Sequence, residues 1–263
     1  RSTLFPYTTL FRSLQAAGLK EIEVTSYVSP KWVPQMADNH AVMSGLQRRD
    51  GVRYSVLTPN LKGFEAALAD RPDEIVVFGA ASQAFSRRNI NCSIEESIER
   101  FAPVVAAARG QGIKVRSAIS CALGCPYQGE VTADEVEHVV RLMKSIGVQH
   151  CGVADTIGVG TPRRVQAAME RALRHFPAED VSGHFHDTYG QALANIYACL
   201  ELGVHVFDAS VGGLGGCPYA KGATGNVATE DVVFMLNGLG IATGIDLDGL
   251  VDAAAYISGV IGR

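Results

Sequence analysis

The sequence lacks the features that would place it outside the ordinary globular proteins. No apolar run reaches the about 18 residues that a membrane-spanning helix requires, so we expect no membrane partner. Lys and Arg (23) do not outnumber Asp and Glu (27), and no basic stripe stands out, which argues against a nucleic-acid partner. With 47% hydrophobic residues the chain is not disordered, and its 263 residues suffice for one α/β barrel or two ordinary domains.

The chain also shows no usual secretion signal, and this bears on its six cysteines. They lie inside apolar runs, so we expect free thiols in a reducing compartment, with the cytoplasm as the default location. Cys121 and Cys125 do not have the two-residue spacing of a zinc knuckle or redox pair, and we interpret them as packing residues. The six are Cys92, Cys121, Cys125, Cys151, Cys199 and Cys217.

Residues 1–13 (RSTLFPYTTLFRS) alternate turn-forming and aromatic residues without a sustained period. The string is similar to a translated sequencing adapter, so we treat it as a non-native segment and expect one catalytic domain over residues 14–263. A natural N-terminal strand is the alternative. Residues 14–18 look like the end of a helix closed by a glycine, so we expect a first strand and most of its helix to be missing.

Seven β-rich runs alternate with helical patterns along the rest of the chain. Ser93 with Glu96 and Thr132 with Glu135 form capping boxes that predict helix starts, and Asp246 is placed to cap a last helix. This alternation predicts βαβ units and a parallel sheet. We therefore predict an α/β fold, a TIM (β/α)8 barrel that lacks its native first strand; an open doubly wound sheet is the alternative. The predicted strands are 21–27, 53–58, 74–79, 114–120, 150–155, 181–186 and 205–210.

Residues 183–187 (GHFHD) carry the strongest chemical signal. Positions two apart in a strand share a face, so His184 and His186 point together, while Asp187 points away or begins the next loop. Two imidazoles at a strand end suit a divalent metal ion; two hydrogen-bonded core histidines are the alternative. Asn226 is placed either to add a carbonyl oxygen or to cap a helix.

A glycine-rich segment, residues 209–219, follows the last predicted strand. It lacks the P-loop lysine pattern, so nucleotide triphosphate binding has little support, and it is either a phosphate cradle or a flexible turn. Cys217 at its tip is either a reactive thiol or an inert one.

Acidic and amide residues lie near other strand ends. Glu23 and Asp155 belong to predicted strands, where carboxylates either pair structurally or act as bases. Glu230 and Asp231 most simply enrich the first turn of a helix. Asn89, beside two arginines, belongs either to an anion site or to a solvated loop.

Taken together, seven stretches of the chain resemble the hydroxymethylglutaryl-CoA lyase family, and the resemblance covers essentially all of residues 14–263. It implies cleavage of 3-hydroxy-3-methylglutaryl-CoA to acetyl-CoA and acetoacetate, as in leucine degradation and ketone-body formation. It also implies a (β/α)8 barrel, an acyl-CoA substrate, Mg²⁺ or Mn²⁺ as cofactor and a homodimer. The stretches are 23–36 (EVTSYVSPKWVPQM), 57–63 (LTPNLKG), 89–96 (NINCSIEE), 120–127 (SCALGCPY), 155–162 (DTIGVGTP), 184–191 (HFHDTYGQ) and 212–220 (GGLGGCPYA).

The resemblance also implies roles for individual residues. The metal ligands that it implies are His184, His186 and Asn226. The catalytic residues that it implies are Cys217, His184, Glu23, Asp155 and Asp231, and the substrate-binding residues are Asn89 and Ser26. Either Cys217 or His184 is expected to protonate the departing enolate.

The start of the sequence departs from the family, which has an Arg-Asp pair at the end of its first strand. In the family the Asp binds the metal and the Arg stabilises the enolate oxygen. Residues 1–13 replace that region, so we expect weak metal binding and an inactive polypeptide as written. Two other functions stay open: a lyase for a longer 3-hydroxy-3-alkylglutaryl-CoA, and a non-catalytic barrel that only binds.

Overall fold

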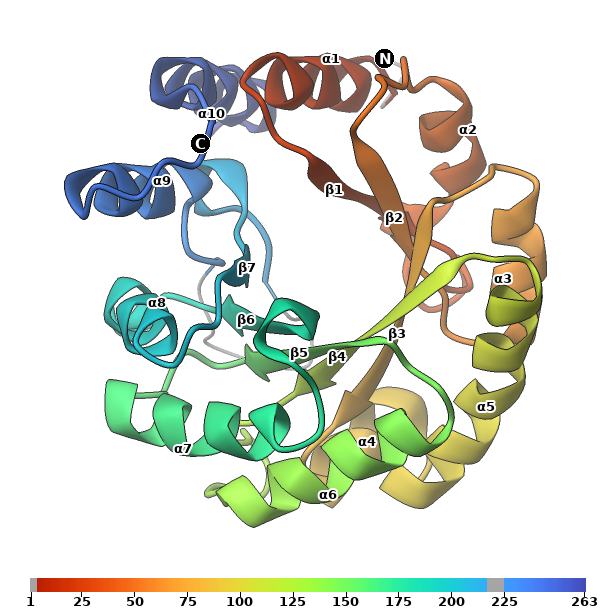
Figure 1. Ribbon diagram of the computed structural model, residues 1–263. Coiled ribbons are helices and arrows are strands. Elements are labelled where there is room, and N and C mark those ends of the chain that lie inside the picture. Colours follow the sequence, from red (N-terminus) through yellow and green to blue (C-terminus); the bar gives the residue numbers. More distant parts are fainter. Residues whose placement is uncertain (1–3, 217–224) are drawn as a thin grey trace.

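The computed structural model, which describes residues 4–216 and 225–263, is built around one parallel sheet. Its strands are paired in sequence order, from β1 to β7, and curl with the helices on the outside (Figure 1). This order excludes the doubly wound alternative, in which the strand order reverses. The strands are β1 (Glu21–Ser26), β2 (Arg53–Leu57), β3 (Glu74–Ala80), β4 (Lys114–Ser120), β5 (His150–Asp155), β6 (Val181–Phe185) and β7 (Val206–Asp208).

All seven predicted strands are confirmed, although β7 is shorter than the predicted run of 205–210. The helices follow the strands as the alternation predicts. They are α1 (Leu4–Ala16), α2 (Asn39–Ser44), α3 (Leu61–Leu68), α4 (Gln83–Ile90), α5 (Ile94–Gly110), α6 (Ala133–Ser145), α7 (Pro162–Leu173), α8 (Ala192–Leu200), α9 (Thr229–Gly238) and α10 (Leu247–Ile261). Three short 3-10 turns join them: η1 (Pro34–Met36), η2 (Ala178–Asp180) and η3 (Val211–Gly213).

Local capping chemistry fixes where several helices begin. Both predicted capping boxes are present: the Ser93 and Thr132 hydroxyls accept from the backbone N–H groups of Glu96 and Glu135, whose carboxylates accept from the capping residues in return. Asp246 caps α10 by accepting from the second residue of that helix. These contacts satisfy N–H groups that have no partner within the first helical turn.

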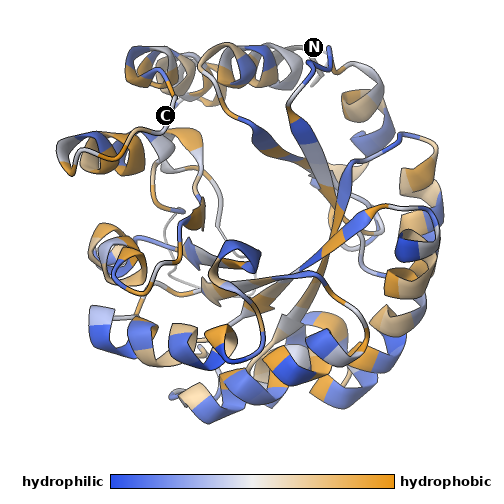
Figure 2. Ribbon diagram, viewed as in Figure 1, coloured by the Kyte–Doolittle hydropathy of each residue, from blue (hydrophilic) through white to orange (hydrophobic). Residues whose placement is uncertain are grey.

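The main hydrophobic core lies between the sheet and the surrounding helices. Val77, Val115 and Val153, on three neighbouring strands, are fully buried in it. The helices turn hydrophobic residues toward the sheet and hydrophilic residues toward solvent (Figure 2). The opposite face of the strands carries polar residues such as Arg116 and Ser182, which therefore face the inside of the curled sheet.

The N-terminal segment takes part in a second hydrophobic cluster. Helix α1 extends back to Leu4, and Leu10 and Phe11 are buried in the cluster that also holds Leu250 of α10. Residues 4–13 therefore form part of a helix. They do not form the N-terminal strand that was the alternative prediction. Their non-native origin, and the missing first strand, stay predictions.

None of the helices formed by the described residues is long and apolar enough to cross a membrane.

Candidate active site

A cavity of about 630 Å³ lies on the inner face of the sheet and is lined by residues of β1 and β7, the two strands that end the sheet. Glu23 from β1, His184 from β6 and Asp208 from β7 line it, as does Asn226 from the segment before α9. Parallel strands bring residues that are distant in sequence to one side of the sheet. Three of these four residues, Glu23, His184 and Asn226, are predicted site residues.

His184 of β6 and His186, which directly follows that strand, lie side by side, as the strand alternation predicts. The ring centroids of His184 and His186 are 5.6 Å apart and the rings are tilted by 46°. His186 is buried, and its backbone forms a bridge with that of Asn226. Of the two positions predicted for Asp187, the structure shows the second, because Asp187 begins the loop after β6. Its carboxylate accepts a hydrogen bond from the backbone N–H of Ala192 at the start of α8. The structure thus brings the three predicted metal ligands together.

The Asn226 amide is held in one orientation with its oxygen unused. Its Nδ2 donates to the carbonyl of Leu214 at 3.0 Å, whereas Oδ1 is buried without a hydrogen-bond partner among the described residues. Helix α9 begins at Thr229 with Ala228 as its capping residue, so Asn226 is not the helix cap. A buried acceptor without a partner is costly unless a ligand satisfies it, which favours a ligand-binding role.

The glycine-rich segment packs directly on Asn226. Gly212, Gly213 and Gly215 have positive φ angles of 67°, 60° and 93°. A Cβ atom on Gly215 would lie 2.6 Å from Asn226 Nδ2, and one on Gly225 would lie 1.7 Å from the Gly213 carbonyl oxygen. These glycines therefore allow a close backbone approach. Cys217, the predicted catalytic thiol, lies outside the described residues.

Arg116 and Asp208 form an ion pair beside His184 that the sequence did not predict. Arg116 Nη2, from β4, contacts Asp208 Oδ1 at 2.7 Å and Oδ2 at 2.8 Å, and Asp208 Oδ2 lies 3.2 Å from His184 Nδ1. Burial opposes ionisation of Asp208, but Arg116 and His184 outweigh it and hold the carboxyl pKa well below its usual range. For His184, burial lowers the pKa, but its hydrogen bond with Asp208 and the charges of Asp208 and Glu23 raise it overall.

Glu23 faces the same charged interior. Desolvation by the surrounding protein raises the pKa of its carboxyl; Arg116 opposes this effect and Asp208 adds to it. The side chain nevertheless remains accessible through the cavity that it lines. Glu23 is therefore the predicted acid–base residue that the described structure places beside His184.

Four other predicted residues within the described part of the chain, Asp155, Asp231, Asn89 and Ser26, do not line this cavity. Asp155 is fully buried, and its two oxygens accept from the backbone N–H groups of Val159 (3.1 Å) and Gly160 (2.7 Å), so it holds the loop after β5. Asp231 is exposed in the first turn of α9, and Asn89 is half-buried in α4. Ser26 ends β1, where its hydroxyl accepts from the N–H of Val28. Their predicted roles stay predictions.

The side chains of His184, His186 and Asn226 suit a divalent metal ion, but three ligands do not complete its coordination. Two neighbouring imidazoles and an unused amide oxygen offer three ligand atoms. Among the described residues, no three His, Cys, Asp or Glu side chains converge to hold a metal ion. A hard cation such as Mg²⁺ prefers oxygen ligands, so a carboxylate ligand is still needed at this site.

A curled parallel sheet with an H-x-H pair at a strand end is typical of enzymes of the (β/α)-barrel class. The HMGL-like family profile matches residues 7–257, so the chain belongs to the HMGL-like family. The 3-hydroxy-3-isohexenylglutaryl-CoA/hydroxy-methylglutaryl-CoA lyase of Pseudomonas aeruginosa is 57% identical over 97% of this chain and 85% of its own length. The human mitochondrial hydroxymethylglutaryl-CoA lyase is 52% identical over 97% of this chain and 78% of its own.

Solved structures agree with these relatives. The hydroxymethylglutaryl-CoA lyase of Pseudomonas aeruginosa matches all of this chain and 87% of its own with a TM-score of 0.95 and 55% identity. A lyase from Acinetobacter baumannii, solved with coenzyme A and 3-methylmalate, matches 98% of this chain and 84% of its own with a TM-score of 0.94 and 34% identity. The predicted family and the predicted enzyme class, a lyase, are confirmed.

Proposed function

We propose that this fold cleaves 3-hydroxy-3-methylglutaryl-CoA to acetyl-CoA and acetoacetate. The observation that carries the proposal is that His184, Glu23 and Asn226 line one cavity and that the Asn226 amide oxygen is unused there. The relatives named for this activity cover nearly the whole chain. The A. baumannii lyase solved with coenzyme A supports an acyl-CoA as the substrate class.

We assign His184, His186 and Asn226 to hold a divalent ion, Mg²⁺ or Mn²⁺. When bound, such an ion supplies positive charge that polarises the tertiary alcohol and fixes its orientation. The protein would contribute two imidazole nitrogens and one amide oxygen, from rings 5.6 Å apart and from a residue whose backbone bridges that of His186.

The proton steps fall to residues of the chain. In the reaction the tertiary alcohol loses its proton, the carbon–carbon bond breaks, and its electrons form the enolate of acetyl-CoA. We assign Glu23 as the base, because it lines the cavity with His184, and burial raises the pKa of its carboxyl above the usual value. Cys217 or His184 then returns a proton to the enolate carbon.

The remaining predicted site residues are assigned roles around the cavity. Asn89 and Ser26 are proposed to contact the substrate, and Asp155, which also holds the loop after β5, is proposed to act in catalysis. Asp231 is proposed to act from the start of α9. The homodimer, the cytoplasmic location and the choice between the two metals are likewise proposals.

The sheet formed by the described residues leaves room for one more strand. In the described residues β1 and β7 end the sheet without pairing to each other, and the cavity lies between them. An eighth strand placed there would close the barrel and bring an Arg-Asp pair beside His184. Losing such an arginine is expected to cost roughly 3 kcal/mol or more of transition-state stabilisation.

A second substrate is favoured by one specific observation. The P. aeruginosa relative is named for 3-hydroxy-3-isohexenylglutaryl-CoA as well as for the shorter substrate. A lyase with a longer acyl chain is therefore the alternative function.

The test compares the chain with a fusion in which the N-terminal region of the P. aeruginosa relative replaces residues 1–13. Both are assayed with Mn²⁺ and each acyl-CoA, and the released acetoacetate or longer 3-oxoacid is measured. We expect turnover by the fusion and loss of turnover in the fusion carrying His186→Gln. The exposed His138→Gln, on α6 and outside the cavity, is the matched control and should keep full activity. A fusion that releases neither product contradicts the lyase function.

A further inference from the structure

We propose that Asp208 is a positioning residue that fixes the tautomer and ring orientation of His184, and that Arg116 in turn fixes Asp208. The inference rests on the proposed function, because it gives His184 one defined nitrogen for a ligand. Neither Asp208 nor Arg116 is among the residues that the sequence motifs single out.

The first step is the contact between Asp208 and His184. Asp208 Oδ2 lies 3.2 Å from His184 Nδ1. An ionised carboxylate only accepts hydrogen bonds, so Nδ1 must carry the proton and a neutral imidazole then has its lone pair on Nε2. Histidines that bind metals commonly donate their other ring N–H to a carboxylate, which sets the tautomer and holds the ring.

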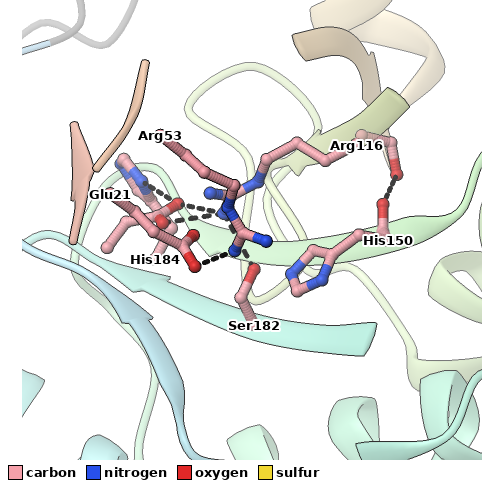
Figure 3. A network of polar contacts seen from close by, with 8 residues as sticks. Glu21, Arg53, Arg116, His150, Ser182 and His184 are labelled. Carbon is pink, nitrogen blue, oxygen red and sulfur yellow. Dashed lines mark hydrogen bonds and ion pairs between the residues drawn. The ribbon is translucent and has the colours of Figure 1, made fainter. Parts of the chain in front are cut away.

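The second step is the anchoring of Asp208. Arg116 Nη2 contacts both oxygens of Asp208, at 2.7 and 2.8 Å, and also the Ser182 hydroxyl at 2.9 Å. Arg116 is only 8% exposed, so the guanidinium has little room to leave this position. Figure 3 shows Arg116 reaching across the strands from its own strand toward Ser182 and His184. The carboxylate is thus held from β4 while it contacts a histidine on β6.

The position of Asp208 does more than neutralise the charge of the buried Arg116. A carboxylate needed only for that charge could lie at any position within reach of the guanidinium. Here the same oxygen that accepts from Arg116 also faces His184 Nδ1, and His184 and Asp208 line the same cavity. A purely structural ion pair predicts no fixed tautomer for His184, and this difference can be measured.

The experiment uses nitrogen-15 NMR of histidine side chains in the metal-free chain, with the His184 signals identified as those lost in His184→Gln. The spectra are recorded at a pH above which the imidazole signals stop changing. We expect the wild-type His184 to carry its proton on Nδ1. In Asp208→Asn, whose amide can also offer a donor to the ring, the Nε2–H tautomer should gain population. Ser182→Ala, which removes a contact of Arg116 but not one of His184, should keep the wild-type tautomer.

A wild-type His184 protonated on Nε2 overturns the proposal without recourse to any variant. An Asp208→Asn spectrum that keeps the wild-type tautomer also overturns it. If Asp208→Asn alone does not fold, the double variant Arg116→Gln, Asp208→Asn removes both buried charges together and is judged in the same way.

A second readout separates this inference from the proposed function. Mn²⁺ added to the chain should broaden the His184 and His186 signals, and Asp208→Asn should raise the Mn²⁺ concentration required by about 10- to 100-fold. Absence of broadening in the chain and in the fusion with the added N-terminal region contradicts the metal site and hence the proposed function. The tautomer result still decides whether Asp208 positions His184.

Discussion

Asp155 carries a prediction at the scale of single residues. Both oxygens of this buried carboxylate accept from backbone N–H groups of the loop after β5. Asp155→Asn removes one of the two acceptors, so we expect the free energy of unfolding to fall by about 1–3 kcal/mol, as measured by urea denaturation. The control is Asp187→Asn, an exposed loop carboxylate with one backbone contact, which should change it by less than about 0.5 kcal/mol. Equal effects would contradict the role of Asp155 in holding the loop.

His150 gives a pH-dependent prediction. Burial and the nearby charge of Arg116 lower the pKa of His150 from 6.5 to about 4, and Nε2 is buried without a partner among the described residues. Between these two pKa values the unfolded chain binds a proton that the folded chain excludes, so folding stability falls as the pH drops from about 6.5 to about 4.

The measurement is the free energy of unfolding against pH. His150→Gln should flatten the slope across that window by up to about 1.4 kcal/mol per pH unit, which corresponds to one proton. The exposed His205→Gln is the control for the loss of an imidazole. A His150→Gln slope equal to that of the wild type would show that another group causes the acid sensitivity.

The residues at the site differ in how far the sequence could identify them. The H-x-H pattern places His184 and His186 on one face by strand geometry alone, and the structure confirms that they are adjacent. Asp208 and Arg116 are 92 residues apart, and a single Asp or Arg in a strand gives no local pattern. Their pairing depends on how the curled sheet brings β4 and β7 together, which only the three-dimensional structure shows.

Helix capping gives a prediction at the scale of secondary-structure elements. Thr132 caps α6 with a hydroxyl that accepts from the Glu135 N–H, whereas Thr161 precedes α7 without any side-chain capping bond. Thr132→Ala should therefore lower the free energy of unfolding by about 1 kcal/mol, and Thr161→Ala should change it much less. Thermal denaturation of the two variants measures the difference. Similar losses would mean that the capping hydroxyl is not what stabilises α6.

The elements themselves could be predicted well because their signals are local. Buried parallel strands read as short apolar runs, and the capping boxes of α5 and α6 mark helix starts within a few residues. The N-terminal segment could not be read in this way, since residues 4–13 show no sustained period and yet form part of α1. That helix is supported by tertiary contacts, in which Leu10 and Phe11 pack in one cluster with Leu250 of α10.

At the scale of the whole molecule, the last prediction concerns amide hydrogen exchange at the two edge strands of the sheet. β1 and β7 end the seven-stranded sheet of the described residues, and an edge strand leaves backbone N–H and C=O groups without sheet partners. Amide hydrogen exchange of β1 and β7 should therefore be faster than that of the central strands β3 and β4, which are paired on both sides.

The fusion with the N-terminal region of the P. aeruginosa relative tests whether a further strand closes this sheet. If one is inserted between β7 and β1, exchange at both edges should slow while exchange in β3 and β4 changes little, because those strands already have both neighbours. Unchanged exchange at the edges, in a fusion that is otherwise folded, would contradict the proposed eighth strand. Edge amides in the unmodified chain that exchange as slowly as those of β4 would instead show that β1 and β7 are already covered, by a second copy of the chain if the effect depends on protein concentration.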